Sequence, residues 1–311
     1  MDNLTHSLVG ALLGQAGLKR KTALAMPTLI IAANIPDIDA ACLFWLDGAQ
    51  HLGVRRGITH GPVAMLVLPV LLWAAMLGWD RWRRRSNAER PAVQKGWLLA
   101  LAYIGTLSHP AFDWLNVYGI RLLEPFSSQW FYGDSLFIID LWLWIGMSAA
   151  LWASLRAERQ GRGGWPRPAG LAVIAASAYI FANGVLTGIA ERRVADALVA
   201  AGVSQPYVVA SPLPLAFWQR EVHWRDAAHY GDTIFTPFAR TDLGAPGQPH
   251  HAADERLDAI AATNAEVRAY RFWSRMPVAV FAANGTLTLT DQRFRHPLAV
   301  DRFTVVAKPQ E

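Results

Sequence analysis

The sequence predicts a mostly α-helical protein: a polytopic helical membrane domain over residues 1–190, followed by a small soluble α+β domain over residues 191–311. Hydrophobic residues make up 53% of the chain and charged residues 17%, whereas soluble domains carry about 25% charged residues. Long apolar segments occur up to residue 190, and short β-prone segments follow them. Fourteen tryptophans add an excess of a residue that is favoured at membrane interfaces.

Five apolar segments approach the length of about 20 residues that a helix needs to cross a bilayer. They are residues 23–46, 62–79, 97–115, 135–155 and 169–190. Residues 4–18, rich in Gly, Leu and Ala, predict a sixth and shorter helix, which we expect to be half inserted or interfacial. Because Met1-Asp2-Asn3 lacks the basic segment of a signal peptide, we expect His6 to remain in the mature chain.

Lysine and arginine are distributed unevenly between the expected loops. Loops 19–22, 80–96 and 156–168 carry thirteen of them, whereas loops 47–61 and 116–134 carry three. Cytoplasmic loops are enriched in these residues. The first set is therefore predicted to face the cytoplasm, which places the C-terminal domain outside it.

The net charge of +5 and the basic stretch 80–85, in which tryptophan is interleaved with arginine, could indicate binding to nucleic acid. This stretch lies between two apolar segments of membrane length, so a cytoplasmic loop explains it better. We therefore expect contact with the lipid bilayer and none with nucleic acid. The single cysteine, Cys42, excludes an intrachain disulfide and a Cys-rich zinc module.

The C-terminal domain is predicted from short alternating segments that Pro, Gly and Asn separate. Strands are expected at residues 208–210, 222–224, 278–282, 286–290 and 303–307. Residues 252–270 are expected to form one helix.

The strongest candidate for a functional element is His109 with Asp113. Residues four apart share one face of a helix, and ionisable groups at membrane depth are costly and usually functional. Ser108 is expected to cap this helix and Pro110 to lie in its first turn. The alternative is a core histidine that is hydrogen-bonded to the aspartate.

Six further His and Asp residues lie in or beside apolar sequence, namely His6, Asp37, Asp39, His60, Asp134 and Asp140. With the orientation given by the loop charges, most of them fall near the extracytoplasmic side. Asp37 and Asp39 lie in mid-segment, where Pro36 can break the helix. Because residues two apart point away from each other on a regular helix, one of them is expected to bind a metal and the other to act from the second layer.

These residue types indicate a metal centre. Mixed imidazole and carboxylate ligands suit zinc, manganese or ferrous iron. Three histidines and three or more aspartates exceed what one catalytic zinc requires, so we expect one or two ions and a metal-activated water that hydrolyses a phosphoester or an amide. The expected ligands are His6, Asp37, His60, His109, Asp113 and Asp134, and the expected proton carriers are Asp39 and Asp140. Asp134 has the alternative role of a helix cap.

The remaining histidines are expected at the protein surface: His51, His223, His229, His250, His251 and His296. None of the serines lies in a Gly-x-Ser-x-Gly elbow, so a hydrolase of that class is not indicated.

Over residues 1–145 the chain resembles the YdjM/YbcI-type family of bacterial inner-membrane proteins, which are inferred to be metal-dependent hydrolases. The matching segments are Thr5-His6-Ser7-Leu8, Pro36-Asp37-Ile38-Asp39, Arg56 to Gly61, Ser108 to Asp113 and Tyr132 to Asp140. The resemblance implies a helical metal-site domain, distantly similar to zinc-dependent phospholipase C, with His6, Asp37, His60, His109 and Asp113 as ligands. The chain departs from the phospholipase pattern because it lacks a further His-x-x-x-Glu pair after Asp113, so a third metal is not implied.

The function that we expect is therefore that of a multi-pass inner-membrane hydrolase with its site on the extracytoplasmic side. A site at membrane depth favours a lipid or lipid-linked phosphoester, which enters sideways from the bilayer. The alternative is a non-enzymatic membrane scaffold with a structural metal and an outer domain that binds a protein partner of unknown identity. Metal transport would need a polar path to the cytoplasmic side, which the apolar inner halves of the segments do not indicate.

Overall fold

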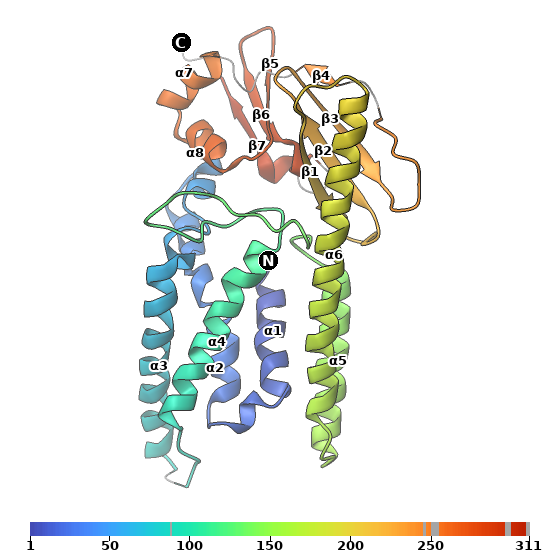
Figure 1. Cartoon of the computed structure of the whole chain (residues 1–311). Helices are drawn as coiled ribbons and strands as arrows, with labels where there is room; N and C mark the ends of the chain where they lie inside the picture. The colour runs from blue at the N-terminus through green and yellow to red at the C-terminus, as the bar shows by residue number, and fades with distance from the viewer. Residues whose placement is uncertain (88, 245–246, 250–254, 296–299, 309–311) are drawn as a thin grey trace. The chain divides into compact units, whose positions relative to one another are not determined.

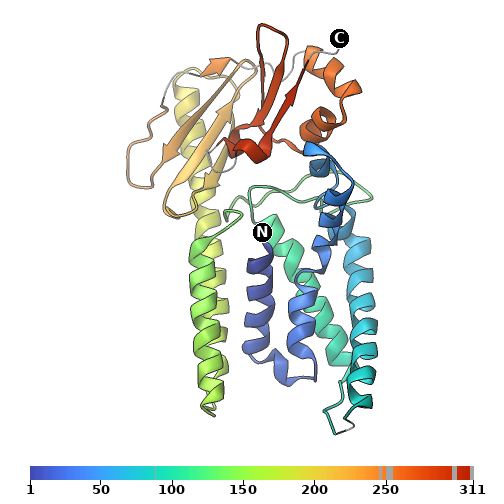
Figure 2. The same cartoon turned by 180° about the vertical axis from the view of Figure 1, so that it is seen from behind.

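The computed structural model describes residues 1–87, 89–244, 247–249, 255–295 and 300–308. It divides into two compact units (Figures 1 and 2). The first, here the helical unit, comprises Met1–Asp39 and Arg56–Gly184. The second, here the C-terminal unit, comprises Ala40–Arg55 and Val185–Glu311.

Among the described residues, five α-helices lie within the helical unit, and a sixth begins there and continues into the C-terminal unit (Figure 1). They are α1 (Asn3–Gln15), α2 (Ala25–Ala32), α3 (Pro62–Arg85), α4 (Lys95–Trp114), α5 (Leu141–Arg159) and α6 (Pro166–Ala200). A 3-10 helix, η2 (Ile35–Phe44), follows α2. The Asp2 side chain caps α1 by accepting hydrogen bonds from the backbone N–H groups of Leu4 and Thr5, which the first turn of a helix leaves without partners.

Helix α2 packs closely against α1 and α4, because glycines allow the backbones to approach each other. A Cβ atom built on Gly10 of α1 would lie 2.7 Å from the carbonyl oxygen of Leu29, and one built on Gly105 of α4 would lie 2.9 Å from that same oxygen. Leu29 and Leu101 are completely buried between these helices. Small residues at a helix contact let the backbones come together in this way.

Two helices, α3 and α6, are long and apolar enough to cross a membrane among the residues that the structure describes. The count rises to three if α2 and η2, bent by 49° at their junction, form one span. The predicted count of five spans therefore stays a prediction. Only 22% of the apolar window of α3 is buried, which is consistent with a helix that faces lipid.

Helix α5 begins later than the sequence indicated. It starts at Leu141, and the Asp140 side chain caps it by accepting a hydrogen bond from Leu143 N at 2.9 Å. The alternative role of Asp134 as a helix cap therefore does not apply to α5. Asp134 lies six residues earlier in non-helical backbone, with a positive φ of 45°.

In the residues that the structure describes, the C-terminal unit contains two antiparallel sheets. The first has the strand order β1 (Tyr207–Pro212), β2 (Arg220–Arg225), β3 (His229–Phe235) and β4 (Gln248–Pro249). One face of this sheet packs on the last turns of α6, where Ala190, Val194 and Leu198 contact Ala210, Val222 and Phe235. The second sheet has the order β5 (Pro277–Phe281), β6 (Leu287–Asp291) and β7 (Thr304–Ala307).

The five predicted strand segments coincide with β1, β2, β5, β6 and β7, whereas β3 and β4 were not predicted. The single helix predicted at 252–270 is wrong, because two helices occur, α7 (Glu255–Thr263) and α8 (Ala265–Trp273). Asn264 separates them, since its side-chain oxygen accepts from the N–H groups of Glu266 and Val267 and thereby caps α8. The 3-10 helix η3 (Gly48–Gly53) packs against α8, which explains why Ala40–Arg55 belong to this unit.

Candidate metal centre

Helix α4 positions His109 and Asp113 one turn apart on the same buried face. Both side chains have no exposed surface, and His109 Nε2 lies 3.5 Å from Asp113 Oδ2. The helix runs without interruption from Lys95 to Trp114. The prediction that Ser108 caps it and that Pro110 lies in its first turn is therefore wrong, and the Ser108 hydroxyl instead donates to the carbonyl oxygen of Gly105 at 2.7 Å.

His60 reaches the same place from the short 3-10 helix η4 (Ile58–His60), just before α3. Its Nε2 atom lies 3.1 Å from Nε2 of His109 and 3.5 Å from Oδ2 of Asp113. Its other ring nitrogen, Nδ1, lies 2.9 Å from the Thr59 hydroxyl. The His60 side chain is fully buried, so it is not exposed at the membrane–water interface.

Asp37 and Asp39 both lie on η2 and contact different histidines. Asp37 Oδ1 lies 3.8 Å from Nε2 of His109. Asp39 Oδ2 accepts a hydrogen bond from Arg56 N at 2.6 Å and lies 3.6 Å from Nδ1 of His60. The 3-10 backbone, with three residues per turn, places these two carboxylates on different sides of one imidazole pair.

Four residues form a group that could hold a metal ion: Asp37, His60, His109 and Asp113. One ligand atom from each lies within 4.8 Å of all the others, and all four residues are buried. Their chemistry fits a cation. His109 Nδ1 lies 2.7 Å from the carbonyl oxygen of Ala33, which can only accept, so Nδ1 carries the proton of the neutral ring and Nε2 presents a lone pair to the group.

The His6 side chain lies against this four-residue group from α1. Its ring stacks on the ring of His109 with the centroids 3.8 Å apart, and its Nε2 atom lies 3.3 Å from Asp113 Oδ1. His6 therefore contacts one ligand carboxylate of the group without belonging to the four.

The structure places the two remaining predicted residues elsewhere in the helical unit. Asp134 is buried in the segment between α4 and α5, outside the four-residue group. Asp140 caps α5, as described above, and accepts a hydrogen bond from the Tyr179 hydroxyl at 3.0 Å. Metal binding by Asp134 and proton transfer by Asp140 stay predictions.

Sequence reasoning did not identify Arg56 as a functional residue. Its Nε atom lies 3.0 Å from Asp113 Oδ2, and its guanidinium donates to Asn116 Oδ1 at 3.0 Å. The guanidinium also lies over the ring of Tyr118, 4.4 Å from its centroid. The α-amino group of Met1 contacts the other oxygen of Asp113. Buried carboxylates need such compensation, so an arginine next to the predicted ligand His60 was the available signal.

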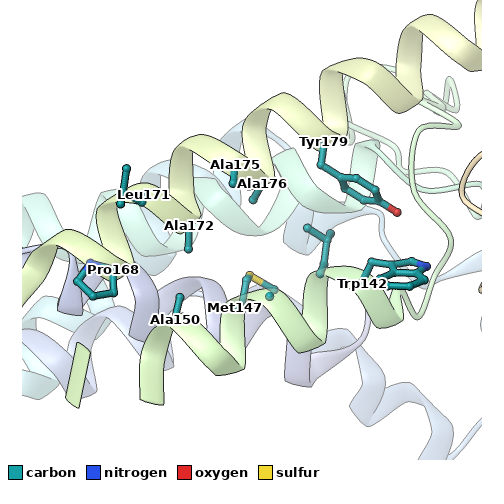
Figure 3. A pocket seen from close by; sticks show the side chains of 11 residues that line it. Trp142, Met147, Ala150, Pro168, Leu171, Ala172, Ala175, Ala176 and Tyr179 are labelled. Atoms are coloured by element: carbon teal, nitrogen blue, oxygen red, sulfur yellow. The ribbon is translucent and has the colours of Figure 1, made fainter. Parts of the chain in front are cut away.

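A groove of about 400 Å³ runs between α5 and α6 in the helical unit (Figure 3). Its lining is almost entirely apolar, with Met147, Ala150 and Ala172 along it and Pro168 at one end. Trp142 and Tyr179 lie at the other end, where the Tyr179 hydroxyl donates to Asp140. A volume of this size lies within the usual range for small-molecule sites, about 300–1,000 Å³.

Residues of α5 that line the groove pack against helix α1, which carries His6. Leu143 and Met147 line the groove and pack in one core cluster with Leu8, Val9 and Leu12 of α1. In addition, the indole N–H of Trp144 donates to the Thr5 hydroxyl at 2.8 Å. The end of the groove that carries Tyr179 is therefore next to the first turns of α1.

Among the other histidines, His223 was predicted at the surface and is buried instead. It lies on β2, opposite Asp232 of β3, and its Nδ1 atom is 2.7 Å from Asp232 Oδ1. The cross-strand carboxylate gives Nδ1 of the ring a partner, which offsets part of the cost of burying this histidine. His229 is exposed as predicted, and His51 lies 2.8 Å from the carbonyl oxygen of Gly48. His250, His251 and His296 lie outside the described residues.

Comparison with known proteins identifies the family of this chain. A family model described as "YdjM inner membrane protein" matches residues 1–190, so the chain belongs to this family. No curated protein and no solved structure matches it. The match covers the whole helical unit and, in addition, Ala40–Arg55 and the first six residues of the second part of the C-terminal unit, 185–190.

Proposed function

We propose that this member of the YdjM inner membrane protein family is a membrane-embedded, metal-dependent hydrolase of a phosphoester in a lipid or lipid-linked substrate. The observation that carries the proposal is the buried convergence of Asp37, His60, His109 and Asp113 in a protein of an inner-membrane family. Ionisable groups are costly at membrane depth, and they are usually retained there for function.

The donor set supports zinc as the ion, with manganese or ferrous iron as alternatives, because two imidazoles and two carboxylates are ligands that these metals share. One ion would be held by the four residues, and His6 is the nearest additional ligand for a second. When bound, such an ion acts as a Lewis acid toward a phosphoryl oxygen and lowers the pKa of a coordinated water.

The surrounding residues have separate tasks in this proposal. Asp39 lies 3.6 Å from His60 Nδ1, on the edge of the ring away from the four-residue group, and is anchored by Arg56 N, so it would orient this histidine. Its role as the proton carrier for the attacking water stays a prediction. The Arg56 guanidinium fixes the orientation of Asp113 and compensates its charge. Ala33 fixes the ring of His109 through its carbonyl oxygen, which is the usual way in which an outer partner orients a ligand histidine.

The groove between α5 and α6 supports a substrate with an apolar chain. From Pro168 to Tyr179 it follows α6 for eleven residues, about 16 Å along the helix axis. The hydrocarbon of one leaflet is about 15 Å thick. A lipid chain in this groove would place its polar end near Tyr179 and Asp140, next to the first turns of α1, the helix that carries His6.

Five spans and a short N-terminal helix are the topology that we propose, with the metal centre and residues 191–311 on the extracytoplasmic side. The support is the distribution of lysine and arginine, thirteen in one set of loops against three in the other.

A non-enzymatic scaffold with a structural metal is the competing function. The two differ in access, because a catalytic metal keeps an open coordination position whereas a structural one is closed. The complete burial of His109 and Asp113 favours the scaffold, and the open groove next to α1 favours the enzyme.

The test is turnover of labelled phospholipids and prenyl phosphates by the purified full-length protein, loaded with zinc or treated with a chelator. We expect metal-dependent release of a phosphorylated headgroup or of phosphate, and its loss in Asp113→Asn. Ala172→Phe, which fills the groove, should raise KM for the lipid, whereas Ile174→Phe on the exposed side of α6 should not. Zinc-loaded protein that hydrolyses neither substrate class would contradict the proposal.

A further inference from the structure

A patch of exposed apolar side chains lies in the loops at one end of the strands of the first sheet in the C-terminal unit. Leu215, Phe217 and Trp218 lie between β1 and β2, and Phe238 follows β3. The exposed fractions are 63%, 38%, 49% and 102%. Strands β1, β2 and β3 are neighbours in this order and alternate in direction. The segment between β1 and β2 and the segment after β3 therefore lie at the same end of the sheet. We call these four residues the loop patch.

Hydrogen bonds hold this end of the sheet against a defined level of α6. The buried Arg220 donates from Nε to the Thr187 hydroxyl at 2.9 Å and from its guanidinium to the carbonyl oxygen of Phe217 at 2.8 Å. Arg193 donates to the carbonyl oxygen of Pro237 at 3.0 Å. The loop patch therefore lies beside residues 187–193 of α6, along which the sheet is seen in Figure 1.

The same part of α6 changes from apolar to charged. Ile189 and Ala190 end the apolar part of this helix, and Glu191-Arg192-Arg193 follow directly. Thr187 and Arg193 are about 9 Å apart along the axis, which is close to the roughly 5–8 Å depth of the headgroup region on each side of a bilayer. Since α6 is long and apolar enough to cross a membrane, these residues mark the boundary between hydrocarbon and headgroups.

We propose that the loop patch inserts into the lipid interface of the bilayer that α6 crosses, and anchors the sheet of the C-terminal unit to it. Tryptophan and other amphipathic aromatic side chains are favoured at this depth, and a water-exposed patch of this kind would otherwise be a liability. The exposed Arg240 follows Phe238 by two residues, and the exposed Arg192 lies at the level of α6 described above; both suit anionic headgroups. Lipid is the occupant because α6 itself continues into the bilayer from this end. The proposal does not depend on hydrolase activity.

The test uses the full-length protein in nanodiscs of phosphatidylethanolamine and phosphatidylglycerol. In a Cys42→Ser background, which removes the only cysteine, single cysteines replace Leu215 and Phe238 and carry a bimane label. Lipids brominated at shallow acyl positions then quench labels that reach the hydrocarbon boundary. Val280→Cys is the matched control, because Val280 is 54% exposed on the other sheet.

We expect at least twofold quenching at positions 215 and 238 and none at 280. Absence of quenching at 215 and 238 would overturn the proposal, whether the labels are open to water or covered by a protein partner. Equal quenching at all three positions would overturn it as well, because contact with lipid would then not be specific to the loop patch. Trp218→Cys provides a further position if one of the other variants does not fold.

Discussion

The carbonyl oxygen of Ala33 determines which nitrogen of His109 can bind a metal. It accepts a hydrogen bond from Nδ1, so Nδ1 holds the proton and Nε2 keeps its lone pair. Nε2 of His60 faces the same space, 3.1 Å away, and Asp113 Oδ2 lies 3.5 Å from both. A metal ion held by these three atoms would use the lone pair of His109 Nε2, an oxygen of Asp113 and, when His60 is protonated on Nδ1, the lone pair of His60 Nε2. The metal-binding prediction therefore depends on single side chains.

Replacing His109 by alanine should remove the metal. Even the loss of an outer-layer partner commonly lowers metal affinity about 10–100-fold, so loss of a ligand should lower it by more. Elemental analysis of the detergent-purified protein should find one or two transition-metal ions per chain in the wild type and less than about a tenth of that in the variant. His51→Ala, a histidine outside the four-residue group, should keep the wild-type metal content. Equal metal content in the wild type and in a His60→Ala/His109→Ala double variant would sink the idea.

In the C-terminal unit, Asp291 is completely buried and paired with Arg293 at 2.8 Å. Burial alone would raise the pKa of this carboxyl. The Arg293 guanidinium, together with hydrogen bonds from Ser274 and from the Met276 N–H, outweighs burial and holds the pKa well below its usual range. The stability that this depressed pKa contributes is complete above about pH 4, the pKa of an unfolded aspartate, and is lost as the pH falls toward the folded pKa.

Asp291→Asn should therefore destabilise the C-terminal unit near neutral pH, by about 3–5 kcal/mol, since it leaves Arg293 buried without its counter-ion. It should also weaken the loss of stability below pH 4. Hydrogen exchange of β6 peptides in the full-length protein, measured by mass spectrometry between pH 3 and 7, follows both effects. Asp301→Asn, at an exposed position, is the control. An unchanged exchange rate of β6 in Asp291→Asn at pH 7 would contradict the expectation.

The sequence could point to most of the clustered residues because His and Asp are conspicuous in apolar segments. It could not show the partners that come from ordinary-looking positions. Arg56 lies in a predicted loop between two apolar segments, where an arginine is usually exposed to water, and only the fold brings it 3.0 Å from Asp113. His223 was assigned to the surface for a related reason: Asp232, which pairs with its Nδ1 atom, lies nine residues away on a strand that was not predicted.

At the scale of elements, Asp37 and Asp39 both lie on the 3-10 helix η2 and point in different directions, as residues two apart also do on a regular helix. Asp37 belongs to the four-residue group, whereas Asp39 contacts His60 from outside it. Helix α2 ends at Ala32, before Pro36, and the chain continues with three residues per turn. The sequence indicated an interruption at Pro36, but the choice of 3-10 over a loop depends on contacts with Arg56 and His60, which lie about twenty residues further along.

The contact between α4 and α2 should be as important for the metal centre as a ligand. A Cβ on Gly105 would lie 2.5 Å from Ala32 Cβ and 3.3 Å from Ala33 N, so Gly105→Val would push α2 away and move the Ala33 carbonyl that orients His109. We expect a loss of about 1–3 kcal/mol in stability from overpacking, with reduced metal content.

Thermal unfolding and elemental analysis of the same preparations measure the two effects of Gly105→Val. The control is Gly78→Val in α3, where a Cβ meets nothing within 4 Å. Metal content that stays at the wild-type level in Gly105→Val, despite a lower Tm, would show that the position of α2 does not control the site.

At the scale of the whole molecule, the division into units is not contiguous in sequence. A boundary near residue 190 was predicted from the change in composition, and Val185 begins the second part of the C-terminal unit. The attachment of Ala40–Arg55 to that unit could not be predicted, because it depends on the packing of η3 against α8, more than 200 residues away. Composition reports what a segment is made of, whereas this contact depends on two surfaces that meet only in the fold.

Topology is the remaining prediction at this scale, and α4 and α5 decide it. They contain 20 and 19 residues, about 30 Å each, which matches the hydrocarbon thickness of a bilayer. Neither helix is apolar enough on average to be counted as a span, and the reason differs between the two. The polar residues of α4, His109 and Asp113, face the protein interior, and Arg156 and Arg159 lie in the last turn of α5, from which long side chains reach the interface.

We therefore expect both helices to cross, in addition to α3, α6 and the α2–η2 pair. Alkaline phosphatase, which is active only outside the cytoplasm, should be active when fused after Glu311 or inserted in the loop 116–134. Green fluorescent protein, which fluoresces only inside, should do so in the loops 80–96 and 156–168, because these carry the excess of lysine and arginine. An inactive phosphatase after Glu311 with a fluorescent reporter at the same position would reverse the orientation. An inactive phosphatase at 116–134 alone would instead show that α4 and α5 do not cross, and would leave three spans.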